Sequence, residues 1–342
     1  MSEIIKNQQW IYTKRPTAEV SNEHYKCATQ NLSTELAHNE VLLEIHYVSV
    51  DPYMRIQQAQ QQSWEAPHPL NSVQQAGTVG KVIKSNSDDI SVGDWVSAYT
   101  GWQQYAVVHH SEINKLDAQQ ADVTSALGIL GMPGRTAWFG LMDAGKPKPG
   151  DTVFVSGASG AVGSLVVQFA KKAGCKVVAF ASSDEKCQWL INALKADVAI
   201  NYRDFSDYQS LNRYLQKQNV KADIYFDNVG GLITDATMPN LNLRARIIIC
   251  GQMSQYNGQL DEVSQGPRFL QHMLYQRATI QGILARDYTH RMDEMITVVA
   301  PWLQAGEIIY DHSIVEGFDL LPEHLASLFT RKSHGKLVVK IR

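Results

Sequence analysis

Cysteine is scarce in this sequence, and the few that occur are far apart. Their spacing gives no C-x-x-C pair and no zinc-ribbon pattern, and it disfavours a disulfide framework. His109 and His110 are adjacent within a predicted strand, where neighbouring side chains point to opposite faces, so we do not expect them to share a metal. The sequence therefore predicts no metal site. The four cysteines are Cys27, Cys175, Cys187 and Cys250.

Long apolar runs and a strong net charge are missing as well. No apolar run approaches the length of a membrane span, and the first ten residues, MSEIIKNQQW, lack the apolar core of a secretory signal. The formal net charge is −3, which offers no attraction to nucleic acid or to an anionic membrane. We therefore expect a cytoplasmic protein that binds neither.

The chain has 342 residues, more than one hydrophobic core comfortably accommodates, so we expect two domains. Residues 1–125 contain mainly short strand-like runs. From 126 to 308, strands alternate with helices, a pattern typical of α/β proteins with a doubly wound parallel sheet. No helix follows a final strand at 336–341, so we expect residues 309–342 to return to the first domain. The predicted strands of the second domain are 152–155, 177–181, 198–201, 223–226, 247–250 and 279–283, and its predicted helices include 184–194 and 208–218.

The stretch TVFVSGASGAVG, residues 152–163, predicts a dinucleotide site. It reads as a buried strand, a glycine-rich turn and the start of an apolar-faced helix, the context in which such a loop binds a pyrophosphate. Gly160 removes a side chain where backbone meets phosphate, and Gly163 lets the helix pack closely on the strand. Ala158 replaces the usual first glycine. The alternative is an ordinary strand–helix turn.

The residues after the next strand favour NADPH over NADH. An acid usually follows this strand in NAD-binding chains, where it binds the ribose hydroxyls. Here Ser182 and Ser183 close the strand, and Lys186 stands in the first turn of the following helix, where its charge opposes the helix dipole. A 2′-phosphate would explain all three. The alternative is a serine N-cap beside a solvated lysine.

With these residues in view, the chain resembles the zinc-independent branch of the medium-chain dehydrogenase/reductase superfamily. Within it, the chain is similar to the NADPH-dependent alkenal and enone reductases, which include the prostaglandin and curcumin reductases. The resemblance covers nearly the whole chain. Beside the glycine loop, it depends on SVDPYMR (49–55), LGMPGRTA (130–137), EKC (185–187), DNVGG (227–231), CGQMSQYN (250–257) and HGK (334–336).

The resemblance implies a Rossmann domain, a GroES-like and mainly β catalytic domain, and an active cleft between them. Zinc-bearing relatives carry a cysteine in the segment occupied here by 49–55 and a Gly-His-Glu further on, and this sequence has neither. Metal-independent chemistry is therefore expected.

The resemblance also implies which residues contact NADPH. Ser333 stands where the family commonly has asparagine, so that contact is in doubt or bridged by water. The pyrophosphate would lie on Gly160, Ala161, Val162 and Gly163; the 2′-phosphate edge on Ser182, Ser183, Lys186 and Tyr202; and the nicotinamide side near Met132, Thr136, Asn228, Cys250, Ser254, Tyr256, Ile283 and Leu284.

Two tyrosines are the candidate catalytic residues. Hydride transfer to the β-carbon of an enone leaves an enolate oxygen that needs a donor and an α-carbon that needs a proton. We expect Tyr256 to hydrogen-bond that oxygen and Tyr53 to position the substrate from the opposing loop. Each could instead be a packed aromatic whose hydroxyl is satisfied elsewhere. Tyr99 and Trp102 could help to wall an apolar substrate slot, and packing in a turn or in the barrel is the equal alternative.

Three further expectations concern function and assembly. The leading function is reduction of small apolar enones and enals with NADPH. The alternatives are a zinc-free quinone reductase and a non-catalytic NADPH-binding redox sensor. The predicted strand at 279–283 could pair with its copy across a two-fold axis, so we expect a homodimer.

Overall fold

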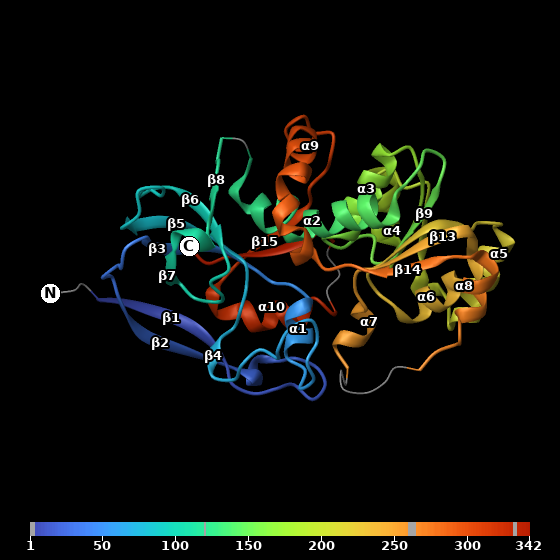
Figure 1. The fold of residues 1–342 in the computed structure, drawn as a ribbon. Helices are drawn as coiled ribbons and strands as arrows, with labels where there is room; N and C mark the ends of the chain where they lie inside the picture. Colours follow the sequence, from blue (N-terminus) through green and yellow to red (C-terminus); the bar gives the residue numbers. More distant parts are fainter. Residues whose placement is uncertain (1–3, 120, 259–264, 331–333) are drawn as a thin grey trace.

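The computed structural model describes residues 4–119, 121–258, 265–330 and 334–342, and two sheet systems organise it (Figure 1). One is a six-stranded, wholly parallel sheet with the order β11-β10-β9-β12-β13-β14. This is the doubly wound order of a Rossmann fold, so the predicted fold class is confirmed. Its strands are β9 (Thr152–Val155), β10 (Lys176–Ala181), β11 (Val198–Asn201), β12 (Ala222–Asp227), β13 (Leu241–Ile249) and β14 (Thr279–Gly282).

Helices cover both faces of the parallel sheet, as the near-continuous apolar runs of its inner strands require. One core lies between the sheet and the helices α2, α3, α4 and α9, and the other lies under α5, α6 and α8 (Figure 1). These helices are α2 (Met132–Phe139), α3 (Gly163–Lys172), α4 (Asp184–Asn192), α5 (Tyr208–Lys217), α6 (Gly231–Thr237), α8 (Leu270–Gln276) and α9 (Met292–Gln304).

The second system is β-rich and contains the start and the end of the chain. A seven-stranded sheet runs β15-β16-β3-β5-β6-β8, with β7 pairing with β3, and a smaller sheet runs β2-β1-β4. β16 pairs antiparallel with β3, which confirms the predicted return of the C-terminal strand. The strands are β1 (Ile4–Tyr12), β2 (Tyr25–Ser33), β3 (Glu40–Ser49), β4 (Ser72–Val73), β5 (Thr78–Ser85), β6 (Trp95–Ala98), β7 (Tyr105–His109), β8 (Asn114–Leu116), β15 (His312–Glu316) and β16 (Lys336–Lys340).

Three short helices complete the part of the structure that bears on function. α1 (Tyr53–Gln57) follows β3, α7 (Met253–Tyr256) follows β13, and α10 (Leu321–Ser327) precedes β16. In Figure 1, α1 and α7 face each other where the β-rich domain meets the Rossmann domain. None of the helices in the described residues has the length and apolar character needed to cross a membrane.

The relative orientation of the His109 and His110 side chains differs from the sequence prediction. His109 ends β7, and His110 begins a 3-10 turn, so the chain leaves the strand between them. Their rings meet edge to face with centroids 4.7 Å apart, and the expectation that they point to opposite faces is wrong. His110 pairs with Asp89 at 3.1 Å. The described ranges nonetheless contain no group of three or more His, Cys, Asp or Glu side chains that could hold a metal ion.

Candidate active site and its relatives

The glycine loop between β9 and α3 is shaped for close approach of the backbone. A Cβ on Gly163 would lie 2.2 Å from the carbonyl oxygen of Gly157, so only glycine lets α3 start this close to the loop. Gly157 itself has a φ of +57°, the left-handed conformation that glycine adopts without strain. A Cβ on Gly160 would meet only the Gly157 oxygen, at 3.3 Å, so this position is far less crowded than Gly163.

Ala158 explains why the loop tolerates a departure from the usual first glycine. Its side chain is fully buried in the core, and its N–H donates to the carbonyl oxygen of Phe180 at 3.1 Å. The methyl group therefore packs inward, while Gly157 takes the left-handed conformation. Val162 precedes α3, and no side chain of the described residues caps the start of that helix. Helix N–H groups at an uncapped start suit a pyrophosphate.

The returning C-terminal chain crosses this loop. Gly335 donates its N–H to the carbonyl oxygen of Ser159 at 2.8 Å and forms a parallel bridge with Gly160. His334 stacks on Trp189 of α4 with ring centroids 4.2 Å apart and forms an ion pair with Asp311. The β-rich domain thus contacts the glycine loop directly. Ser333, predicted to contact the cofactor, lies outside the described residues.

Ser182, Ser183 and Lys186 come together at the carboxyl end of β10. Ser183 is the N-cap of α4 and accepts a hydrogen bond from the Lys186 N–H at 3.3 Å. The Lys186 Nζ donates to Ser182 Oγ at 3.3 Å, and the lysine is only 8% exposed. The alternative to a phosphate site was a serine N-cap beside a solvated lysine. The N-cap is present at Ser183, but Lys186 is buried and not solvated. Tyr202 begins the turn after the neighbouring strand β11.

Asp227, at the carboxyl end of β12, organises the loops predicted to face the nicotinamide. Its buried carboxylate accepts from Ser156 Oγ of the glycine loop at 2.8 Å and from Gln252 Nε2 of the β13–α7 turn at 3.2 Å. It also accepts from the Gly230 N–H of its own loop at 2.9 Å and from Thr234 Oγ1 of α6 at 2.6 Å. Asp227 belongs to the DNVGG motif of the resemblance, but no role of its own was predicted for it, although an acid ending an apolar strand is a visible signal.

Asn228 and Ser254 brace the same loops. The Asn228 amide donates to the Ser156 carbonyl oxygen at 2.8 Å, and Ser254 Oγ donates to the Val229 carbonyl oxygen at 2.7 Å. Cys250 directly follows the neighbouring strand β13, and burial raises the pKa of its thiol to about 12. A thiol with a raised pKa forms little of the reactive thiolate at neutral pH.

The remaining predicted contacts flank these loops. Thr136 is buried in α2 and donates its hydroxyl to the Met132 carbonyl oxygen at 2.8 Å. Ile283 follows β14 and donates its N–H to the Ile249 carbonyl oxygen at 3.1 Å, so it and Leu284 continue from the carboxyl end of that strand.

The two candidate catalytic tyrosines come from different domains. Tyr256, in α7, accepts a hydrogen bond from the Gln252 N–H at 2.7 Å, and burial raises its pKa to about 12. Tyr53, in α1, shares a hydrogen bond of 2.8 Å with the hydroxyl of Tyr99, and burial raises its pKa well above the usual range. Trp102 is fully buried and packs on Tyr25, which agrees with the barrel-packing alternative for this residue.

Comparison with known proteins gives a consistent result over the whole chain. A family model described as the N-terminal domain of oxidoreductase matches residues 8–116, and one described as zinc-binding dehydrogenase matches residues 161–300. Despite the second description, the donor groups of a zinc site are not brought together in the described residues, and we derive no step through zinc.

Individual relatives are similar from end to end. The NADPH-dependent curcumin reductase of Escherichia coli is 35% identical and the match covers 98% of this chain and 97% of the relative. The NADP(+)-dependent 2-alkenal reductase of Nicotiana tabacum is 36% identical, with 99% and 96% covered. The crystal structure of CurA from Vibrio vulnificus in complex with NADPH superimposes with a TM-score of 0.90 at 37% identity, with 98% and 99% covered. The protein therefore belongs to the medium-chain dehydrogenase/reductase superfamily, in its family of NADPH-dependent alkenal and enone reductases.

Proposed function

We propose that this enzyme reduces the carbon–carbon double bond of α,β-unsaturated aldehydes and ketones, without a metal. The observation that carries the proposal is the Tyr256 hydroxyl. It accepts from the Gln252 N–H, and its pKa of about 12 keeps it protonated at neutral pH. A hydroxyl held in this way can donate its own proton to an oxygen that gains negative charge.

The residues around the glycine loop fit NADPH. The chemistry that NADPH supplies when bound is a hydride for the β-carbon of the substrate. Gly160 and the uncapped start of α3 would accept the pyrophosphate. The buried Lys186, already directed at Ser182, would pair with the 2′-phosphate, for which Ser183 and Tyr202 stand on the same edge.

Tyr256 and Tyr53 would have different roles toward the substrate. Tyr256 would donate to the carbonyl oxygen and stabilise the enolate, because a fixed donor stabilises charge as it develops. Tyr53, whose hydroxyl is already fixed by Tyr99, would orient the carbonyl from the other domain. Asp227 would act indirectly, since its carboxylate holds the turn that carries Gln252 and Tyr256.

A substrate panel tests the function directly. An alkenal, an aryl enone such as benzalacetone and a benzoquinone would each be assayed with NADPH and with NADH. We expect turnover of the first two and a clear preference for NADPH. Faster turnover of the quinone would favour the quinone reductase alternative. NADPH binding, seen by fluorescence enhancement, with no turnover of any substrate would favour the non-catalytic sensor.

We also propose a homodimer. β14 ends the parallel sheet, and Ile280 on it is 42% exposed. The adjacent helix α8 leaves Leu270 and Leu274 more than 70% exposed, at 73% and 72%. An apolar surface beside an open strand edge suits pairing with a second copy. Light scattering should report a dimer for the native chain and a monomer for Ile280→Arg, and a monomeric native chain would contradict the proposal.

Two further proposals concern the limits of the two domains and the cellular location of the protein. We propose that residues 1–125 and 309–342 form the catalytic domain and 126–308 the NADPH-binding domain, which limited proteolysis would test.

We propose a cytoplasmic location, which suits cysteines that are all in the described residues and all free of disulfides. Cell fractionation would test it.

A further inference from the structure

Arg55 carries a charge that is almost completely withdrawn from water. The residue is 1% exposed and lies two positions after Tyr53 in the five-residue helix α1. Its Nη2 donates to the carbonyl oxygen of Ala18 at 2.6 Å and to that of Gly258 at 3.2 Å. A buried guanidinium is stable only where its hydrogen bonds are made, so these acceptors hold the side chain in place.

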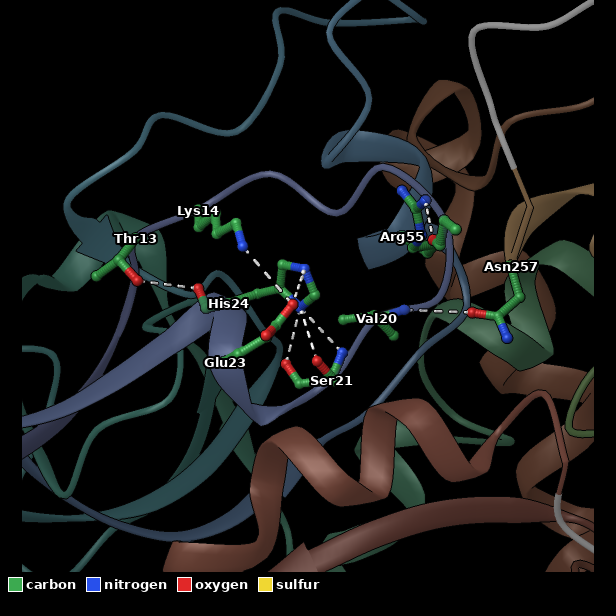
Figure 2. A network of polar contacts seen from close by, with 9 residues as sticks. Thr13, Lys14, Val20, Ser21, Glu23, His24, Arg55 and Asn257 are labelled. Atoms are coloured by element: carbon green, nitrogen blue, oxygen red, sulfur yellow. Dashed lines mark hydrogen bonds and ion pairs between the residues drawn. The ribbon is translucent and has the colours of Figure 1, made fainter.

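These bonds join the two domains. Ala18 lies between β1 and β2, whereas Gly258 lies two residues after Tyr256, in the chain that leaves α7. Close by, the Val20 N–H donates to Asn257 Oδ1 at 3.4 Å and crosses the same junction. Figure 2 shows Arg55 next to the Val20–Asn257 contact.

We infer that Arg55 is a positioning residue that sets Tyr53 and Tyr256 relative to each other. It shares a short helix with Tyr53 and binds the chain just beyond Tyr256. Displacement of a donor by about 1 Å from the reacting oxygen can lower a rate by about 10²-fold, so a rigid link between the two tyrosines matters for catalysis. The inference depends on the proposed catalytic roles of the two tyrosines.

Arg15 provides a matched control. Its guanidinium also donates to backbone carbonyl oxygens, those of Gln58 at 3.3 Å, Ala59 at 3.1 Å and His68 at 3.1 Å. All three acceptors belong to the β-rich domain. Arg15→Met therefore removes arginine–carbonyl bonds near α1 without breaking one that reaches the chain after Tyr256.

The test combines kinetics with amide hydrogen exchange on the full-length enzyme. We expect Arg55→Met to lower kcat for an enone by about tenfold or more, while the NADPH KM changes less than about twofold. In a Tyr256→Phe background the same change should cost less than about threefold, because Arg55 acts through Tyr256. Exchange should increase in residues 251–258 and stay unchanged in residues 152–165. Arg15→Met should leave kcat within about twofold of the native value.

Several results would overturn the inference. Fully additive losses in the double variant would show that Arg55 acts independently of Tyr256. Unchanged exchange in 251–258 would show that Arg55 does not hold that segment. If Arg55→Met does not fold, Arg55→Lys is the deciding variant, because lysine keeps the charge but not the planar guanidinium. We expect Arg55→Lys to lower kcat less than Arg55→Met would and to increase hydrogen exchange in residues 251–258 in part. Native exchange in that segment would overturn the inference. If Tyr256→Phe is fully active, the proposed role of Tyr256 fails, and the catalytic part of the inference fails with it, whatever exchange shows for the segment.

Discussion

The hydroxyl of Tyr256 accepts a hydrogen bond of 2.7 Å from the backbone N–H of Gln252, four residues earlier in the same turn. This bond orients the ring and occupies a lone pair, while the proton stays available. Tyr256→Phe keeps the ring and removes the donor. We expect kcat/KM for an enone to fall by about 10- to 100-fold, somewhat less than the loss of a principal oxyanion donor, since other polar groups and water can substitute in part.

The control for this variant is Tyr214→Phe, in α5, whose side chain is 36% exposed and far from the turn in sequence. It should keep native kinetics. NADPH affinity should change less than about twofold in Tyr256→Phe, because phenylalanine keeps the ring predicted to lie on the nicotinamide side and the glycine loop is untouched. Unchanged kcat/KM in Tyr256→Phe would remove the tyrosine from the mechanism.

The pH dependence of the reaction follows from the same residue. The donor form of tyrosine is the neutral form, which is populated below its pKa. Because burial raises the pKa of Tyr256 to about 12, the donor persists to high pH. We expect kcat/KM for an enone to show no loss from tyrosine ionisation up to about pH 10 and to fall only above it.

A pH–rate profile measured with saturating NADPH checks this, over the range in which the enzyme stays folded by circular dichroism. The pKa shift of Tyr256 is opposite in direction to that of an activated tyrosine, whose lowered pKa would place the loss of the donor near neutrality. A decrease centred below about pH 9 that disappears in Tyr256→Phe would contradict the assignment of a neutral donor.

Local sequence patterns predicted much of the Rossmann domain. The limits of β9 and β11 agree with the prediction, because apolar runs between turn residues mark buried parallel strands. By contrast, β13 begins at Leu241, six residues before the predicted start, since Asn242 and Arg244 interrupt its apolar pattern. The hairpin of β1 and β2 was not predicted individually, because half-exposed strands rich in polar residues carry no such run.

A contact in the site was predictable where both of its residues lie close together in the sequence. The association of Ser182, Ser183 and Lys186 is of this kind, because a helix start and the preceding strand end are adjacent in sequence. The groups that donate to Asp227 and the Arg55–Gly258 bond were not predictable, since these contacts depend on how distant loops meet after folding. The sequence left the role of Trp102 open for the same reason: only the packed domain shows that it lies against Tyr25.

The two glycines of the loop should separate cofactor binding from folding. A Cβ at Gly163 would lie 2.2 Å from the Gly157 oxygen and 2.8 Å from the Ala158 Cα, and backbone atoms cannot move away cheaply. Gly163→Ala should therefore lower the free energy of unfolding of the cofactor-free protein by about 1–3 kcal/mol. Gly160→Ala meets only one oxygen, at 3.3 Å, and should cost less than about 1 kcal/mol.

Gly160→Ala, which should fold normally, should nonetheless bind NADPH weakly. The methyl group of Gly160→Ala would stand where the pyrophosphate approaches, so we expect the Kd of NADPH to rise by about tenfold or more with little change in melting temperature. Calorimetric unfolding and fluorescence titration with NADPH measure the two quantities. Native NADPH affinity in Gly160→Ala would place the pyrophosphate elsewhere.

Lys186 should decide between NADPH and NADH. Its ammonium is buried beside Ser182 at the end of β10, with no acid closing that strand. Lys186→Met removes a charge-assisted hydrogen bond to the 2′-phosphate, about 1.5–3 kcal/mol, so the KM for NADPH should rise by about 10- to 100-fold. NADH carries no such phosphate, and its KM should change less than about threefold. Lys217→Met, an exposed lysine in α5, is the control and should change neither value. Equal losses with both cofactors would mean that Lys186 supports the fold of the site and does not recognise the phosphate.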